Sequence, residues 1–176
     1  VRARHVAGFV CAATAAIWTP LNTPLPSASA QPCPDVEVVF ARGTTEDPGV
    51  GPEGQAFVDA LRARLGTKTM GVYPVDYPAT LDFPTALDGI RDASAHVEST
   101  AAACPNTQMV LGGFSQGAML SLYFASHHTP PPAAIVAFSG RLIVEDDAPM
   151  PAGLPVFIAH GARDTMIPIA DADKAE

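Results

Sequence analysis

Short runs of β-branched and apolar residues alternate along the chain with longer segments in which apolar residues recur at helical spacing. The strand-like runs cover residues 36–41, 70–75, 109–111, 134–138 and 156–159, and the helix-like segments cover 53–65, 84–97 and 118–126. Strands separated by helices form a parallel sheet that is covered on both faces. We therefore predict an α/β fold of three layers around a central, mostly parallel sheet of about five strands, with its chemistry at the carboxyl ends of the strands.

The size and charge of the chain narrow the classes of function. Its 176 residues suit one domain, and 48% apolar against 16% charged residues exclude a disordered chain. A net charge of −8 repels phosphate backbones, so we expect no nucleic-acid partner. After the first thirty residues no apolar run reaches the ~18 residues that span a bilayer. We therefore expect no stable membrane insertion, and we expect a monomer.

The first thirty residues have the order of a targeting segment. Two arginines open the chain, residues 6–18 are apolar and mostly small, and Ala-Ser-Ala at 28–30 has the form of a cleavage site. We predict a signal peptide over residues 1–30, a mature domain over 31–176, and a secreted, extracellular protein. The alternative, a membrane anchor, is disfavoured because the apolar segment is short and prolines follow it.

Cleavage of this segment leaves Cys33 and Cys104 as the cysteines of the mature chain. Two cysteines in an exported protein indicate one disulfide, and the alternative is a pair of free thiols. Their spacing is not that of a metal site, and no glycine-rich dinucleotide loop follows a strand. We expect no metal and no cofactor.

The third strand runs directly into Gly113-Phe114-Ser115-Gln116-Gly117, and a helix follows. This Gly-x-Ser-x-Gly pattern between a strand and a helix is typical of a nucleophile elbow. The turn is so tight that a side chain at either glycine would meet neighbouring backbone, and it holds the serine in a strained conformation. We predict Ser115 as a nucleophile. The alternative is a glycine-rich turn with an ordinary serine.

A serine nucleophile needs two donors aimed at the oxygen of the reacting carbonyl. One is expected to be the backbone N–H of Gln116, directly after the nucleophile. The other is expected from the loop after the first strand, residues 42–45, where Thr44 offers an N–H and a hydroxyl. The alternative for Thr44 is a turn residue that caps local backbone.

Residues 33–117 resemble the cutinase family of secreted serine esterases, which have the α/β-hydrolase fold. The matching stretches are CPDVEVVFARGTTE at 33–46, GQAF at 54–57, VYPVDYP at 72–78, Cys104-Pro105 and GGFSQGA at 112–118. The resemblance implies Ser115 as the nucleophile, with Thr44 and Gln116 as the oxyanion pair. It also implies the disulfide between the two mature cysteines.

Residues 117–170 resemble instead the phospholipase/carboxylesterase branch of the α/β-hydrolases. The matching stretches are GAMLSLY at 117–123, SGRL at 139–142 and PVFIAHGARDTMIP at 155–168. In the motif of that branch Asp164 is the triad acid, and it directly follows a strand, where an acid must lie to orient an imidazole. The alternative is a loop aspartate that caps the helix beginning near Pro168.

The base of the triad is missing from the expected place. In this fold the triad residues occur in the order serine, acid, histidine, and no histidine follows Asp164. His96, His127 and His128 precede the acid, and the resemblance implies that His160 holds the acid-bearing loop. We therefore expect the catalytic histidine not to be in this chain, and the domain to be truncated before the histidine loop.

These observations favour a secreted serine esterase that hydrolyses carboxylic esters through an acyl-enzyme on Ser115. Its partner would be an ester substrate, either a lipid or a cutin-like polyester. Two alternatives stay open. One is a catalytically inert hydrolase-fold fragment without its histidine, and the other is a carboxylesterase or acyl-thioesterase-like enzyme, against which the signal peptide and the cysteine pair argue.

Overall fold

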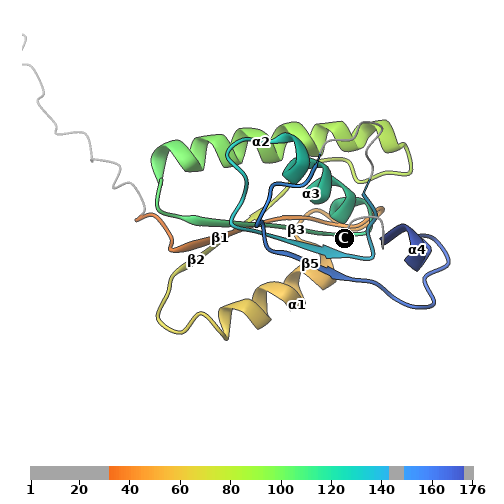
Figure 1. Ribbon diagram of the computed structural model, residues 1–176, viewed down its shortest axis with the longest axis horizontal. Helices are drawn as coiled ribbons and strands as arrows, with labels where there is room; N and C mark the ends of the chain where they lie inside the picture. The colour runs from red at the N-terminus through yellow and green to blue at the C-terminus, as the bar shows by residue number, and fades with distance from the viewer. Residues whose placement is uncertain (1–31, 143–148, 173–176) are drawn as a thin grey trace, which may run out of the picture. The chain divides into compact units, whose positions relative to one another are not determined.

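The computed structural model describes residues 32–142 and 149–172, so the predicted signal peptide at 1–30 lies outside the described residues. The predicted parallel sheet is confirmed, with five strands in the order β2-β1-β3-β4-β5, all of them parallel (Figure 1). The strands are β1 (Val36–Ala41), β2 (Met70–Pro74), β3 (Gln108–Phe114), β4 (Ala134–Phe138) and β5 (Val156–Ala159).

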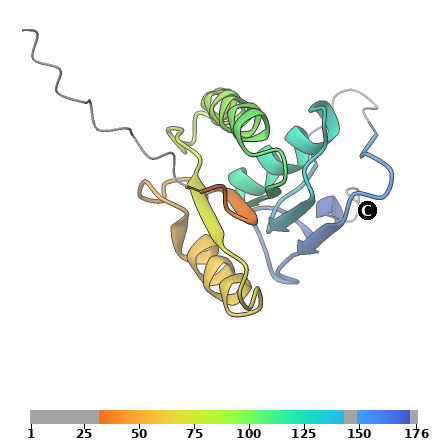
Figure 2. The same ribbon diagram turned by 90° about the vertical axis from the view of Figure 1, so that its left-hand side faces the viewer.

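Helices cover both faces of this sheet, as predicted. They are α1 (Gly51–Arg62), α2 (Ala86–Ala103), α3 (Gln116–His127) and the short α4 (Ile169–Ala172), with a 3₁₀ turn η1 (Phe83–Thr85) before α2. The helices α2 and α3 pack on one face, and α1 packs on the other (Figures 1 and 2). The three layers place the loops after β1, β3, β4 and β5 along one edge of the sheet.

The core of the fold lies around β1, an inner strand of the sheet, in which Val38 to Ala41 are at most 2% exposed. The helix α3 is buried on almost all sides because it packs against β3 and β4 and beneath α2. Helix α1 begins at Gly51, with a proline in its first turn, and ends at Arg62. The helix-like segment was expected to run to residue 65, but residues after Arg62 form a turn in which Gly66 has φ at +63°. Within the described ranges no helix is both long and apolar enough to cross a membrane.

The disulfide between Cys33 and Cys104 is present and joins residues 71 positions apart. Cys33 precedes β1, and Cys104 is the C-cap of α2, directly before β3. The bond therefore ties the beginnings of two neighbouring strands at the sheet edge opposite the loops that follow them. The alternative of two free thiols is excluded.

Removing this disulfide is expected to destabilise the fold strongly. Chain-entropy reasoning for a loop of this length gives a loss of roughly 4 kcal/mol in the free energy of unfolding. Urea unfolding of the oxidised protein and of the Cys33→Ser/Cys104→Ser double variant measures this loss. Equal midpoints would contradict the prediction.

Candidate active site

Ser115 lies at the junction of β3 and α3 with φ of 53° and ψ of −115°, a conformation that a side-chain-bearing residue rarely adopts. Its N–H donates to Phe138 O on the neighbouring strand at 2.9 Å, and its carbonyl accepts from Met119 in α3 at 3.2 Å. These bonds from β4 and α3 hold the strained residue in place. The conformation predicted for Ser115 is therefore confirmed, whereas its catalytic role stays a prediction.

The two glycines of the elbow have steric reasons to be glycine. A Cβ at Gly113 would lie 2.1 Å from the carbonyl carbon of Gly117, and a Cβ at Gly117 would lie 1.9 Å from Ala41 O. Both distances are shorter than any contact that a folded protein tolerates. The elbow is thus packed directly against the end of β1, from which the loop 42–46 leaves.

Gln116 is the first residue of α3, where backbone N–H groups have no acceptor within the helix. Its side chain is buried at 2% exposure and donates through Nε2 to Thr80 O at 3.3 Å. The side chain thus turns back toward the segment after β2. The Gln116 N–H remains at a helix N-terminus, where developing negative charge is favoured.

Thr44 is half-buried in the loop after β1. The two neighbouring amides are already hydrogen-bonded, because the Gly43 N–H donates to Glu46 Oε2 at 2.6 Å and the Thr45 N–H donates to Ala79 O at 2.6 Å. Among the residues that the structure describes, no acceptor is found for the Thr44 N–H. The Thr44 amide, predicted as the second oxyanion donor, is thus available for a ligand.

Two residues of this region were not identified from the sequence. Arg42 is buried at 4% exposure and Tyr77 at 3%, and each hydrogen-bonds to the backbone of the other. The signal for Tyr77 was its place in the stretch at 72–78 that resembles the cutinase family. Spacing alone does not bring together side chains that are 35 positions apart.

The Glu46 carboxyl lies against the same loop, where it accepts the hydrogen bond from the Gly43 N–H. Burial is the main cause that raises its pKa above the ordinary 4.5. The Gly43 N–H lowers the pKa, and the nearby carboxyl of Glu53 at the start of α1 raises it further. Folding therefore makes Glu46 easier to protonate than it is in the unfolded chain.

The raised pKa of Glu46 leads to a prediction about how the stability of the fold depends on pH. The contribution of protonated Glu46 to the free energy of unfolding is fully present below the pKa that Glu46 has in the unfolded chain, and it is lost as the pH rises through the pKa in the folded protein. Glu46→Gln keeps an oxygen for the Gly43 N–H and cannot ionise, so it should gain stability relative to wild type between about pH 4 and pH 7. Urea unfolding across this range measures the difference, with Asp59→Asn on the exposed side of α1 as control. A difference independent of pH would contradict the prediction.

Asp164 follows β5, at the same sheet edge as Ser115. Its Oδ1 accepts the N–H groups of Ile167 at 3.0 Å and Met166 at 2.9 Å, and these bonds, in that order, hold its pKa below the ordinary value. Oδ2 lies 3.6 Å from Nε2 of His160. Asp164 thus holds the turn before α4 and does not cap the helix itself, which begins at Ile169. It lies after the end of β5, where an acid was expected. Its role as the triad acid stays a prediction.

The His160 ring is almost fully buried, and its Nε2 donates to Ile167 O at 2.6 Å. Its Nδ1 is buried without a partner among the described residues. The ring therefore braces the turn that carries Asp164, as the sequence resemblance implied.

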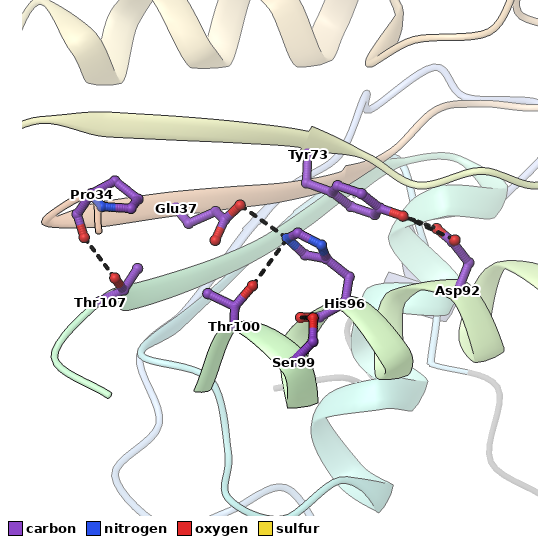
Figure 3. A network of polar contacts seen from close by, with 8 residues as sticks. All are labelled: Pro34, Glu37, Tyr73, Asp92, His96, Ser99, Thr100 and Thr107. Carbon is purple, nitrogen blue, oxygen red and sulfur yellow. Dashed lines mark hydrogen bonds and ion pairs between the residues drawn. The ribbon is translucent and has the colours of Figure 1, made fainter. Parts of the chain in front are cut away.

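His96 lies in a polar network between α2 and the sheet (Figure 3). Its Nε2 contacts Glu37 Oε1 at 2.9 Å, and its ring stacks on Tyr73 with 3.5 Å between centroids. The Tyr73 hydroxyl in turn donates to both oxygens of Asp92, at 3.0 and 3.1 Å (Figure 3). These bonds connect α2 to β1 and β2 and occupy His96 in the fold.

His127 and His128 are at the far end of α3. Twelve helical residues separate His127 from Ser115, which corresponds to about 18 Å. The His127 ring stacks on Tyr123, and the His128 ring stacks on Phe124 and approaches Glu98 at 3.4 Å. His96, His127 and His128 are thus engaged in contacts away from Asp164, whereas His160 lies beside it, and the expectation that none of the four is the base stays a prediction.

An apolar groove of about 940 Å³ runs along the α1 face of the sheet. Its floor includes Phe114, Phe138 and Phe157, and Phe157 is 58% exposed. The groove reaches the sheet edge at Ser139 and His160, and Ser115 is not among its lining residues. Within the described ranges no group of three or more histidine, cysteine or acidic side chains is placed to hold a metal ion.

Comparison with known proteins agrees with this geometry. A family model described as Cutinase matches residues 32–137. "Phospholipase Culp4" of Mycobacterium tuberculosis is 51% identical over 66% of this chain and 51% of its own length. A solved Trichoderma reesei cutinase in complex with a phosphonate inhibitor has a TM-score of 0.61 and 32% identity, over 82% of this chain and 74% of the other.

The phospholipase/carboxylesterase of Dyadobacter fermentans shares the fold, with a TM-score of 0.59 and 21% identity over 81% of this chain and 73% of the other. The family match ends at residue 137, so it extends past residue 117, where we expected the resemblance to cutinases to end, and residues 138–176 lie outside it. The chain spans about half the length of the curated relatives it matches, or less.

Proposed function

Because the chain belongs to the cutinase family, we propose that its fold serves the hydrolysis of carboxylic esters through an acyl-enzyme on Ser115. The observation that carries the proposal is the strained serine between two obligatory glycines, with the available amides of Thr44 and Gln116 at the same sheet edge. Relatives described as a phospholipase and as carboxylesterases support ester substrates, lipids among them.

In the proposed reaction the Ser115 Oγ attacks the ester carbonyl carbon, and its proton passes to an imidazole base. The carbonyl oxygen becomes an oxyanion that accepts hydrogen bonds from the amides of Thr44 and Gln116. The C–O bond to the alcohol then breaks, and the alcohol leaves with the proton. Water attacks the acyl-enzyme in the same way and releases the acid.

Asp164 would orient the imidazole and stabilise its charged form. Its lowered pKa keeps it ionised at neutral pH, which this role requires. We expect that none of the four histidines of the described chain is the base, and residues 165–176 contain no histidine. Without a histidine base, a second candidate function is a hydrolase fold that binds esters and does not hydrolyse them.

We also propose that the protein is secreted through the signal peptide at residues 1–30 and acts as a monomer. The disulfide supports export, because such bonds persist in oxidising compartments. N-terminal sequencing of secreted protein should find a terminus at Gln31.

A fluorophosphonate probe tests the function, because it reacts with an activated serine. Mass spectrometry should find the label on Ser115 and no label on the Ser115→Ala variant. Ser121→Ala provides a matched control, since Ser121 is a buried serine of α3 whose hydroxyl donates to Gly117 O at 3.0 Å. Labelling that is equal in wild type and Ser115→Ala would refute the proposed nucleophile.

A further inference from the structure

Arg42 is a buried cation whose nearest acceptors are neutral. The guanidinium donates through Nε to Glu46 O at 2.9 Å, through Nη1 to Val75 O at 3.4 Å, and through Nη2 to Tyr77 O. It also lies over the Tyr77 ring, 5.0 Å from the centroid. Burying a guanidinium is costly unless its donors are satisfied, and here backbone carbonyls satisfy them.

These bonds join two segments that are separate in sequence. One is the loop 42–46, and the other is the stretch 75–80 that follows β2. The Tyr77 hydroxyl returns a hydrogen bond to Arg42 O, and Thr45 N donates to Ala79 O. The loop is therefore held at its first residue, at its last residue and beside Thr44.

The other oxyanion donor is positioned against the same structure. A Cβ at Gly117 would lie 2.7 Å from Arg42 O, so the backbone of the elbow is packed against the backbone of Arg42. The Gln116 side chain reaches Thr80 in the stretch 75–80. Both amides are thus placed relative to one rigid unit, at the centre of which lies the Arg42 guanidinium.

We infer that Arg42 is a positioning residue for the oxyanion hole. Its three hydrogen bonds hold the Thr44 N–H at the place where, together with the Gln116 N–H, it receives the developing oxyanion. The inference rests on the proposed ester hydrolysis. Arg42 does not act on the oxyanion through its positive charge. It acts because the spacing of its guanidinium N–H groups fixes the position of the loop.

Two substitutions separate geometry from charge. Arg42→Lys keeps the positive charge, but one ammonium cannot reach three carbonyls that an arginine fork spans. Tyr77→Phe keeps the ring and removes only the hydroxyl that donates to Arg42 O. Arg91→Met is the matched control, because Arg91 lies on the outer side of α2 with a side chain 75% exposed.

The first measurement is the rate of Ser115 labelling by the fluorophosphonate at saturating and at limiting probe. Loss of an oxyanion donor costs about 10²-fold in rate, so we expect Arg42→Lys to lose on the order of tenfold or more at saturation with little change in half-saturation. Tyr77→Phe should lose less, and Arg91→Met should match wild type. An Arg42→Lys protein that labels as fast as wild type overturns the inference.

The second measurement does not depend on activity. Hydrogen exchange of the Thr45 amide, which donates to Ala79 O, should accelerate in Arg42→Lys and Tyr77→Phe while the amide of Val39 in β1 stays protected. Unchanged exchange at Thr45 overturns the inference even if labelling falls. A wild-type protein that labels no faster than Ser115→Ala refutes the proposed function. The exchange result alone then decides whether Arg42 holds the loop.

Discussion

Added imidazole is expected to accelerate the reaction of Ser115 with p-nitrophenyl esters and with fluorophosphonates. The printed polypeptide has no histidine after Asp164, and its other histidines are engaged in the fold, so its basal rate should be low. General-base catalysis contributes ~10²- to 10⁴-fold, and a free imidazole that reaches the elbow should restore on the order of 10²-fold. The measurement is the labelling rate at Ser115 against imidazole concentration.

Ser115→Ala sets the background for this experiment, because imidazole itself hydrolyses activated esters. Asp164→Asn tests the proposed acid in the same assay. Asparagine retains an oxygen for the amides of Met166 and Ile167 and has no charge to pair with imidazolium. We expect it to fold normally and to lose most of the imidazole-dependent rate. Full basal activity that disappears on replacing one of the four described histidines would show that the base is in this chain.

Gly117→Ala is expected to be the most destabilising single methyl addition in the described chain. The added carbon would lie 1.9 Å from Ala41 O and 2.7 Å from Arg42 O, and both neighbours are backbone that cannot rotate away. Overpacking of this kind costs about 3 kcal/mol or more when no side chain can yield. Urea or thermal unfolding measures the loss, and Ser115 labelling should fall with it.

Gly161→Ala provides the control for this substitution. The nearest atoms to a Cβ there are at 4.0 Å, so a methyl group fits. Its unfolding midpoint should stay close to that of wild type. If Gly117→Ala were as stable as Gly161→Ala, the elbow would not be packed against the end of β1 as described.

The sheet could be predicted from the sequence because its strands are short runs of apolar and β-branched residues that alternate with helix-like segments. β1, β4 and β5 have the bounds expected from their β-branched runs. β3 was expected to be shorter, since its last residues, Gly112 to Phe114, do not have strand-like composition. They are strand because β1 and β4 pair with them on both sides.

The strain at Ser115 was also predictable, because glycines at fixed positions reveal where backbones approach one another. The hydrogen bonds of Arg42 to the stretch 75–80 could not be predicted, because they join its side chain to carbonyl groups 33 and 35 positions away in the sequence. The same applies to Asp164, whose two backbone donors exist only once the turn before α4 has formed. Hydrophobic periodicity carries no information about such polar contacts.

The way in which β5 joins the sheet has a consequence for how this family can diversify. β5 is an edge strand attached through a ladder from Ile135–Val156 to Phe138–Ala159, and the acid-bearing turn follows it. The proposed nucleophile and the two proposed oxyanion donors lie upstream, inside the part of the chain that the family model covers. An edge strand and the turn after it can be replaced, in evolution or in a designed chimaera, as one unit that joins the sheet through four residue pairs. Such a replacement leaves the residues proposed to bind the reacting carbonyl in place.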